Sequence, residues 1–313
     1  MKIYGIITLC FLITFWVLGN LKSNQQQLIY LGQTPPTSTP KIFAPGLISK
    51  EDESEFGSVF NKDATEFYYG VDINGKAEIR YTWLEGKTWS KPKVLLSHDK
   101  YSLNDPFLSP DENRLYFISN KALESDDVKE DYDIWYIERE DNKGNPKLIN
   151  ADPNINTNKN EYYISFAKNG SMYFSSNKDA EENRQHNFNI YSSKFKNGAF
   201  LKPKLLGGSI NTNAYEADVF VSPDESYVIF CSIRKEGFGQ GDLYISFKDE
   251  TGNWSKATNM GAVINTEGHE LCPFVTKDGK YFFYTSNQDI YWVDASVIQQ
   301  LKNKQLIKLK HNK

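Results

Sequence analysis

The sequence predicts an all-β protein folded as a single β-propeller of four-stranded antiparallel blades, and three observations support this. First, the heptapeptides INTNKNE, INTNAYE and INTEGHE begin at residues 155, 210 and 264. They recur about 55 residues apart, which is the length of one propeller blade. Second, each runs into an apolar stretch, a turn containing Asp, Asn or Gly, and an aromatic run that ends in Ser, which is a hairpin pattern. Third, aromatic residues make up 14% of the chain, which favours strands.

Five units appear when the chain is aligned on the turn between the first and second strands of each hairpin. The five turn residues are Asp63, Asp111, Asn169, Asp224 and Asp278. The expected first strands are 57–61, 106–109, 162–166, 217–222 and 271–276. The expected second strands are 66–70, 114–119, 171–176, 227–232 and 280–286. Runs of this length, rich in β-branched and aromatic residues and bounded by turn signals, are typical of strands.

Third and fourth strands complete each unit. The third opens with a polar residue and an aliphatic one, at 78–79, 133–134, 189–190, 242–243 and 289–290. The fourth strands are expected at 91–96, 145–149, 202–206 and 256–263. The fifth unit ends after its third strand, and the segment 39–48 (TPKIFAPGLI) has the character of a fourth strand. The sequence therefore predicts five blades closed by an N-terminal strand, with six blades as the alternative.

The two ends of the chain lie outside the repeats. Residues 1–23 are expected to be an export signal, because a short basic start precedes an apolar run too short to span a membrane. Residues 24–40 are expected to be a polar linker rich in Pro and Thr, and residues 41–297 the propeller. Residues 298–313 are expected to be a basic C-terminal helix and tail. The short helix is expected to run from 295 to 309 and to pack Val297, Ile298 and Leu301 under the propeller.

Charge and cysteine content exclude some classes of function. The net charge of −4 and a pI near 5.7 give no basic footprint of the kind that nucleic-acid binding requires. An attachment to a membrane is expected only if the export signal stays uncleaved. Cleavage would leave Cys231 and Cys272, both in apolar surroundings, so two buried free thiols are expected rather than a disulfide.

Several segments resemble a known repeat. Residues 222–224 (SPD), 241–244 (GDLY) and 253–256 (NWSK), followed by INTEGHE, resemble the TolB-type, WD-like propeller repeat, also called the PD-forty repeat. The resemblance covers residues 41 to about 295. It implies a β-propeller in an exported or envelope protein, often one that binds other proteins or envelope carbohydrate. It implies no single activity.

Carboxylates recur at one place in the units. Eight residues before the turn residue stand Glu55, Glu161, Glu216 and Glu270, and two residues further along the strand stand Asp105 and Asp218. Since side chains two residues apart share a strand face, all six are expected to rim one mouth of the central channel and to bind a ligand there. The alternative is structural, with each Glu tying one blade to the next.

The loops between second and third strands lie at the same mouth and differ most between units. Phe238, in a Gly-rich loop, is a candidate aromatic contact. The acidic loop from Glu124 to Asp133 leaves calcium open, although its spacing does not match a twelve-residue calcium loop. No other metal and no cofactor are expected, since His269 has no partner pattern for zinc.

These features predict an exported, non-enzymatic binding module that holds an envelope protein or a glycan at its loop-bearing mouth. Two alternatives remain open at this point. One is a glycan-active hydrolase or lyase, which would need two carboxyl groups about 5 to 9.5 Å apart, one with a raised pKa. The other is a structural spacer within the envelope.

Overall fold

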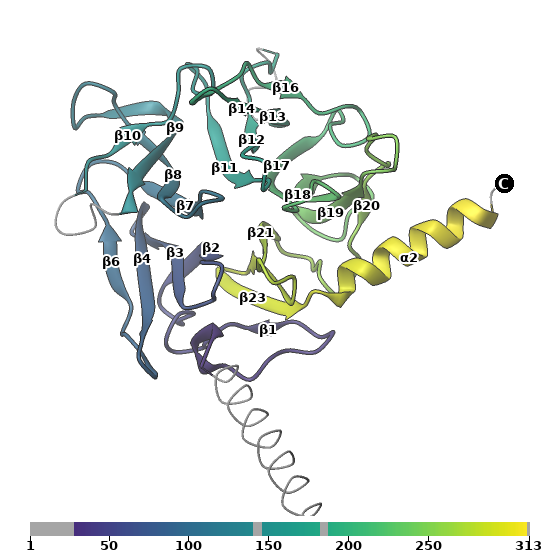
Figure 1. Ribbon diagram of the computed structural model, residues 1–313, viewed down its shortest axis with the longest axis horizontal. Coiled ribbons are helices and arrows are strands. Elements are labelled where there is room, and N and C mark those ends of the chain that lie inside the picture. Colours follow the sequence, from purple (N-terminus) through teal and green to yellow (C-terminus); the bar gives the residue numbers. More distant parts are fainter. Residues whose placement is uncertain (1–27, 140–145, 182–186, 312–313) are drawn as a thin grey trace, which may run out of the picture.

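The computed structural model describes residues 28–139, 146–181 and 187–311. These form five antiparallel sheets arranged as blades around a central channel (Figure 1). The predicted five-bladed propeller is confirmed, and the six-bladed alternative is wrong. The expected export signal, residues 1–23, lies outside the described residues. None of the described helices is long and apolar enough to cross a membrane.

Each blade is numbered by its place in the chain, and its strands run outward from the channel. Blade 1 contains β2 (Ser54–Phe60), β3 (Glu66–Ile73), β4 (Lys76–Glu85), β5 (Thr88–Trp89) and β6 (Lys93–Leu96). Blade 2 contains β7 (Leu103–Leu108), β8 (Arg114–Lys121), β9 (Val128–Glu138) and β10 (Ile149–Asn150). Blade 3 contains β11 (Glu161–Phe166), β12 (Met172–Ser176), β13 (Asn189–Ser193) and β16 (Lys204–Leu205), with a small hairpin of β14 (Phe195–Lys196) and β15 (Ala199–Phe200).

The last two blades complete the ring. Blade 4 contains β17 (Tyr215–Val221), β18 (Tyr227–Ile233), β19 (Asp242–Phe247) and β20 (Thr258–Asn259). Blade 5 contains β21 (Leu271–Val275), β22 (Tyr281–Ser286) and β23 (Asp289–Asp294), and its fourth strand is β1 (Lys41–Ile42). Lys41 pairs with Trp292 and Ile42 with Tyr291, so the predicted closure by an N-terminal strand is confirmed.

The closing segment is anchored by aromatic side chains. Phe43 is fully buried, and its ring lies 5.1–5.9 Å from the rings of Phe60, Phe67, Phe283 and Trp292. This contact joins blade 5 to blade 1 through the core, because Phe60 and Phe67 come from β2 and β3.

Part of the expected linker belongs to the folded body. A short 3₁₀ helix, η1 (Tyr30–Gly32), lies within residues 24–40, and Tyr30 and Leu31 are buried. The indole N–H of Trp89 donates to the carbonyl of Leu28 over 2.6 Å. The composition of residues 24–40 predicted a polar linker, because polar residues there outnumber Tyr30 and Leu31, the two apolar residues that are buried.

The C-terminal helix α2 (Ser296–His311) projects from blade 5 (Figure 1). Its first turn packs on the propeller, where Val297 and Ile298 are buried and Leu301 contacts the core. The remaining cysteines, Cys231 and Cys272, are free and buried, as predicted.

Candidate functional site

The loop-bearing mouth is the end of the ring at which the first strands begin. The four glutamates expected to rim it, Glu55, Glu161, Glu216 and Glu270, are all 0% exposed. Each lies close to the turn that precedes its own strand. Asp105 and Asp218 are partly accessible from the channel, and Phe238 is 50% exposed on the loop after β18.

The glutamate of each INT heptapeptide is held by its own turn. In blade 5 the Thr266 backbone N–H donates to Glu270 Oε2 over 2.9 Å, and the hydroxyls of Thr266 and Ser286 each donate to Oε1 over 2.7 Å. Glu161 and Glu216 are held in the same way by Thr157 with Ser176 and by Thr212 with Ser232. Arg234 adds an ion pair to Glu216 at 3.2 Å. The oxygens of these three carboxylates are therefore engaged in hydrogen bonds to their own turn and strand.

The other residues of the heptapeptide join it to the preceding blade. Asn265 accepts a bond from the backbone N–H of Leu243 and donates to its carbonyl, while Ile264 is buried at 1% exposure. Asn156 makes the same pair of bonds with Ile134, and Asn211 with Ile190. The recurring motif is thus accounted for by blade-to-blade packing.

Glu55 differs because its turn has no INT sequence. The Lys50 backbone N–H donates to its Oε1 over 3.2 Å, while its buried Oε2 has no hydrogen-bond partner among the described residues. Burial raises the pKa of Glu55 to about 7, and burial likewise raises the pKa of Glu161 to about 7.

A second set of residues, two positions after the glutamate position, lines the channel. The set is Gly57, Asp105, Tyr163, Asp218 and Cys272. All five have a positive φ, between 41° and 52°, next to a break in strand register. A bulge of this kind re-aims the side chain, so the two-residue alternation assumed from the sequence fails here. That is why the glutamates and the aspartates do not form one ring.

Asp105 and Asp218 form a carboxyl pair inside the channel. Burial, reinforced by the charge of Asp218, raises the pKa of Asp105 to about 8. Burial raises the pKa of Asp218 to about 6. The Cys272 thiol lies 3.5 Å from Asp105 Oδ1. A Cβ on Gly57 would meet the same oxygen at 2.5 Å, so glycine makes room for this side chain.

Tyr163 crosses the channel at the level of this pair. Its side chain is 2% exposed, and its hydroxyl donates to the carbonyl of Pro273 in blade 5 over 2.8 Å. Because β11 belongs to blade 3, this bond crosses the ring. The mouth therefore leads to side chains packed across the channel.

Aromatic rings border the mouth above the pair. Tyr132, Tyr162, Phe188 and Tyr215 form a row, with successive ring centroids 5.3, 5.0 and 5.6 Å apart. The three tyrosines are partly exposed. Burial raises the pKa of Tyr162, and the charges of Tyr132, Asp105 and Asp218 contribute.

A hollow of about 350 Å³ lies at the mouth between blades 4, 5 and 1, lined by residues that include Phe56, Gln240 and His269. His269 Nε2 lies 3.3 Å from the Cys231 thiol, and burial lowers the pKa of His269, so the neutral imidazole is favoured. Gly241 lies against this ring, because a Cβ there would meet Nε2 at 2.4 Å.

The acidic loop of blade 2 carries its own cations. Lys129 pairs with Asp131 and Asp133, both at 2.7 Å, Lys100 with Asp127 at 3.2 Å, and Lys121 with Asp126 at 3.4 Å. Within the described ranges, no group of three or more His, Cys, Asp or Glu side chains could hold a metal ion. In the blade 3 loop, residues 182–186 lie outside the described residues.

Sequence reasoning missed Tyr163, Cys272 and Gly57 as channel residues. The signal was present, since all three stand at the offset that singled out Asp105 and Asp218. The sequence suggests a pattern of carboxylates at this offset. What recurs at the offset is a backbone conformation with positive φ, whatever the side chain.

No family model matches the chain, and no curated protein matches it. Among solved structures, TolB from Acinetobacter baumannii is similar at 13% identity and a TM-score of 0.48, covering 78% of this chain and 55% of that one. A putative TolB from Agrobacterium tumefaciens is similar at 16% identity and a TM-score of 0.48, covering 76% and 72%. A luciferin-regenerating enzyme is similar at 8% identity and a TM-score of 0.43, covering 76% and 90%. The chain thus spans about half the length of the first of these, and similarity at this level concerns the fold alone.

Proposed function

We propose that the protein is an exported, non-enzymatic binding module that holds a segment of an envelope protein on its loop-bearing mouth. One observation carries this proposal: the buried Tyr163 side chain crosses the channel below the mouth and bonds to the opposite side of the ring. The mouth therefore presents a surface bordered by aromatic side chains, which suits an extended partner. Export rests on the apolar start of the sequence.

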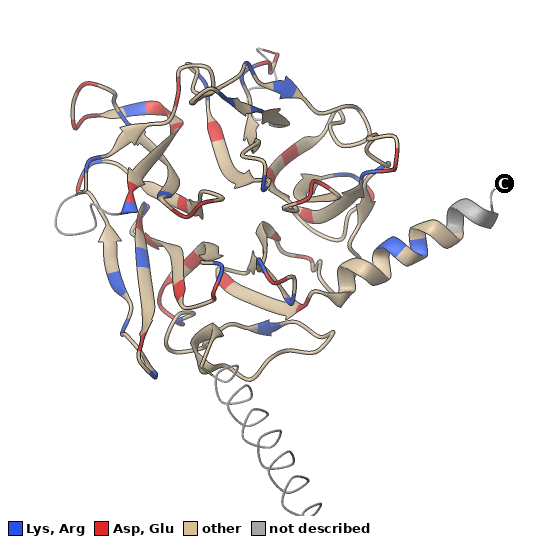
Figure 2. Cartoon of the chain, in the orientation of Figure 1, with Lys and Arg blue, Asp and Glu red and all other residues tan. Residues whose placement is uncertain are grey.

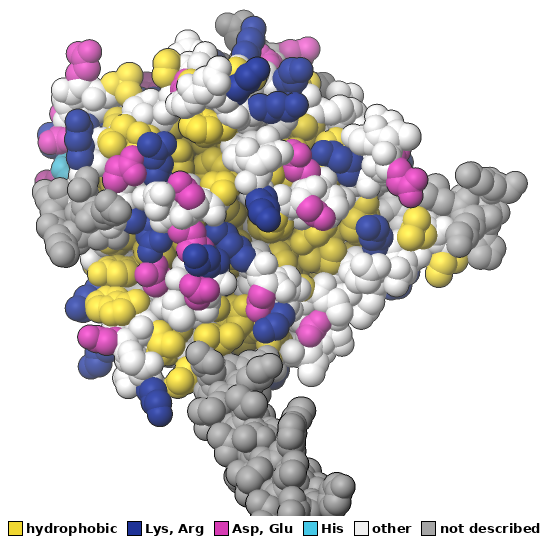
Figure 3. All heavy atoms as spheres, viewed as in Figure 1, with side chains coloured by type: hydrophobic (Ala, Val, Ile, Leu, Met, Phe, Trp, Pro, Cys, Tyr) yellow, Lys and Arg dark blue, Asp and Glu magenta, His cyan; other side chains and the backbone are white. Residues whose placement is uncertain are grey.

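The mouth has the chemistry of a protein-binding surface. Partly exposed tyrosines, which supply large contact area with few rotatable bonds, stand beside Phe238 and a hollow containing His269. Acidic and basic residues form ion pairs in the blade 2 loop, and Figure 2 shows both signs distributed around the ring. Figure 3 draws one face of the ring, on which basic, acidic and hydrophobic side chains are interspersed.

An envelope glycan is the second ligand that this surface suits, because tyrosine rings also stack on sugars. The enzymatic alternative draws support from the carboxyl pair, whose pKa values are unequal, as a general acid and its partner require. Tyr163 opposes it, since a sugar ring would need the space that this side chain fills. A purely structural spacer would need no partner at the mouth.

A comparison of three proteins tests the proposal. Wild type, a mouth variant (Tyr162→Ala with Phe238→Ala) and an outer-edge control (Leu205→Ala, 53% exposed) are used to capture partners from envelope extract. We expect wild type and the control to retain the same protein saturably, and the mouth variant to lose it by at least about tenfold. Equal capture by all three would contradict the proposal.

The enzymatic alternative has its own assay. Wild type and an Asp105→Asn, Asp218→Asn variant are incubated with envelope polysaccharide, and new reducing ends are counted. Release by wild type alone would replace the binding proposal with a hydrolase. Equal signals at background support the non-enzymatic proposal.

A further inference from the structure

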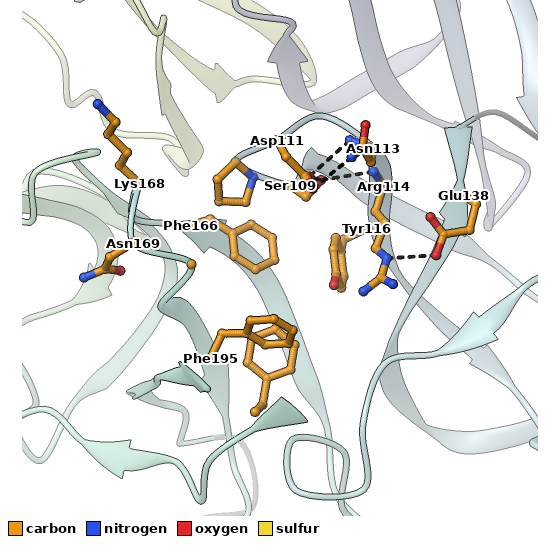
Figure 4. A pocket seen from close by; sticks show the side chains of 13 residues that line it. Ser109, Asp111, Asn113, Arg114, Tyr116, Glu138, Phe166, Lys168, Asn169 and Phe195 are labelled. Carbon is orange, nitrogen blue, oxygen red and sulfur yellow. Dashed lines mark hydrogen bonds and ion pairs between the residues drawn. The ribbon is translucent and has the colours of Figure 1, made fainter. Parts of the chain in front are cut away.

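A pocket on the face opposite the mouth lies between blades 2 and 3. It encloses about 460 Å³. Figure 4 shows Tyr116, Phe166 and Phe195 around an open space, with Arg114 to one side, paired with Glu138 at 2.9 Å. Phe195 comes from the β14–β15 hairpin, and its ring lies 5.0 Å from that of Phe200. Phe195 is 42% exposed, whereas Phe166 is 9% and Tyr116 3% exposed, so the pocket has an apolar floor and one exposed aromatic wall.

The same place between blades 5 and 1 is occupied by the chain itself. The ring of Tyr30 lies 5.1 Å from that of Phe60 and 4.8 Å from that of Tyr281. Its hydroxyl interacts with the side chains of Thr276 and Asp278. Its backbone N–H donates to the carbonyl of Ala64 over 3.3 Å. Tyr30, from the segment that precedes β1, thus fills the space between blades 5 and 1.

The two places correspond position by position when the blades are aligned on their turn residues. Asp278, Thr276 and Tyr281 of blade 5 correspond to Asp111, Ser109 and Arg114 of blade 2. Phe60 and Ala64 of blade 1 correspond to Phe166 and Gly170 of blade 3. Trp89 corresponds to Phe200 by its place in the outer hairpin, because the residues that follow them, Ser90 and Leu201, accept equivalent bonds from Thr82 and Ser193. The turns share their geometry too, because Ser109 donates to Asp111 over 2.6 Å and Thr276 donates to Asp278 over 2.7 Å.

Two of the three remaining interfaces on this face are bridged by side chains of described residues. Between blades 1 and 2, Arg139 pairs with Glu66 and contacts the hydroxyl of Tyr68. Between blades 3 and 4, Glu225 accepts bonds from Asn169 and Tyr173. Between blades 4 and 5, the first turn of α2 lies over the interface and lines a hollow of about 440 Å³, so α2 occupies part of this place. Among the described residues, no side chain fills the place between blades 2 and 3.

We propose that this open pocket binds a tyrosine side chain presented by a peptide segment of a partner protein. The bound ring lies between Phe166 and Phe195, and its hydroxyl donates to Asp111, the counterpart of the Asp278 side chain with which the Tyr30 hydroxyl interacts. The Gly170 carbonyl accepts the backbone N–H of the bound tyrosine. This site is separate from the mouth, so it adds a second point of attachment and does not depend on the function proposed for the mouth.

The segment that carries Tyr30 supplies the peptide with which the proposal is tested. A synthetic peptide Leu-Ile-Tyr-Leu-Gly-Gln, copied from residues 28–33, is titrated into wild type, into Phe195→Ala and into the control Leu201→Ala. Leu201 is 45% exposed on the same blade and does not line this pocket, so it matches Phe195 in exposure. Binding is followed by calorimetry, and the fold of each variant by circular dichroism.

We expect wild type and Leu201→Ala to bind the peptide equally, and Phe195→Ala to bind it at least about tenfold more weakly. A peptide with alanine in place of tyrosine is expected not to bind wild type. Absence of binding to wild type at millimolar peptide would overturn the proposal. So would equal binding by Phe195→Ala, which would place the peptide elsewhere, for example in exchange with Tyr30.

Discussion

At the scale of single residues, Asp105 is the group most at odds with its surroundings. It is a carboxyl group partly accessible from the channel, near a second carboxyl group and a thiol, with φ of 50°. Burial of an acid favours its protonated form, since the charged form loses its hydration. Tyr163 at the same level donates its hydroxyl to a carbonyl, so it does not neutralise the pair.

We predict that the Asp105→Asn variant lacks part of the decrease in the free energy of unfolding that the wild-type protein shows as pH rises. With a pKa of about 8 in the folded chain against a usual 3.8, Asp105 keeps a proton that the unfolded chain releases from about pH 4. The free energy of unfolding should therefore fall as pH rises from 4 to 8, and the variant should lack this part of the fall. Above pH 8 the variant should be more stable by about 2 kcal/mol or more. Urea unfolding at pH 5, 7 and 9 measures this, and parallel curves for the two proteins would contradict it.

At the scale of elements, the INT turn is the joint between blades. Its Asn holds the third strand of the preceding blade, and its Thr holds the Glu that opens the next first strand. The turn therefore fixes the rotation of one blade against the next.

We predict that Asn265→Ala lowers the free energy of unfolding by about 2–4 kcal/mol, because it leaves the buried N–H and C=O of Leu243 without their side-chain partner. Asn213→Ala, at an exposed position of the preceding heptapeptide, should change it by less than about 0.5 kcal/mol. Equal losses in the two variants, measured by urea unfolding, would show that the joint does not depend on this amide.

The sequence predicted the strands well, but it did not predict how the candidate side chains are placed around the channel, and there is a physical reason for the difference. Hairpins were readable because hydrophobic runs and turn residues act locally, as at Asp224, whose turn matches its prediction. The position of a side chain relative to the channel depends on the bulge at Asp218 and its counterparts, and nothing in residue type announces a positive φ at Asp, Tyr or Cys. Burial of Tyr30 escaped notice too, because it depends on a cleft formed by blades distant in sequence.

At the scale of the whole molecule, ring closure concentrates on one aromatic contact. Phe43 brings the rings of β2, β3, β22 and β23 together and has no exposed surface. Its neighbour Ile42 pairs in the same sheet yet is 37% exposed. A comparison of variants at these two residues therefore distinguishes the contribution of core packing from that of strand pairing.

We predict that Phe43→Ala lowers the free energy of unfolding by about 3–5 kcal/mol, since it leaves a cavity at the seam. Ile42→Ala should cost less than about 1 kcal/mol. The measurement is thermal and urea unfolding of both variants beside wild type. A Phe43→Ala protein as stable as wild type would mean that the ring is not closed through this core.

The closing strand also has a consequence for the order of events during synthesis. Lys41 is among the first residues of the folded body to be made, yet its partner, Trp292, is among the last. The strand β1 therefore stays without a partner until residues 289–294, which form β23, have been made. A newly made chain must keep this strand from pairing with other molecules during that interval, so the time spent as an open ring sets its exposure to aggregation.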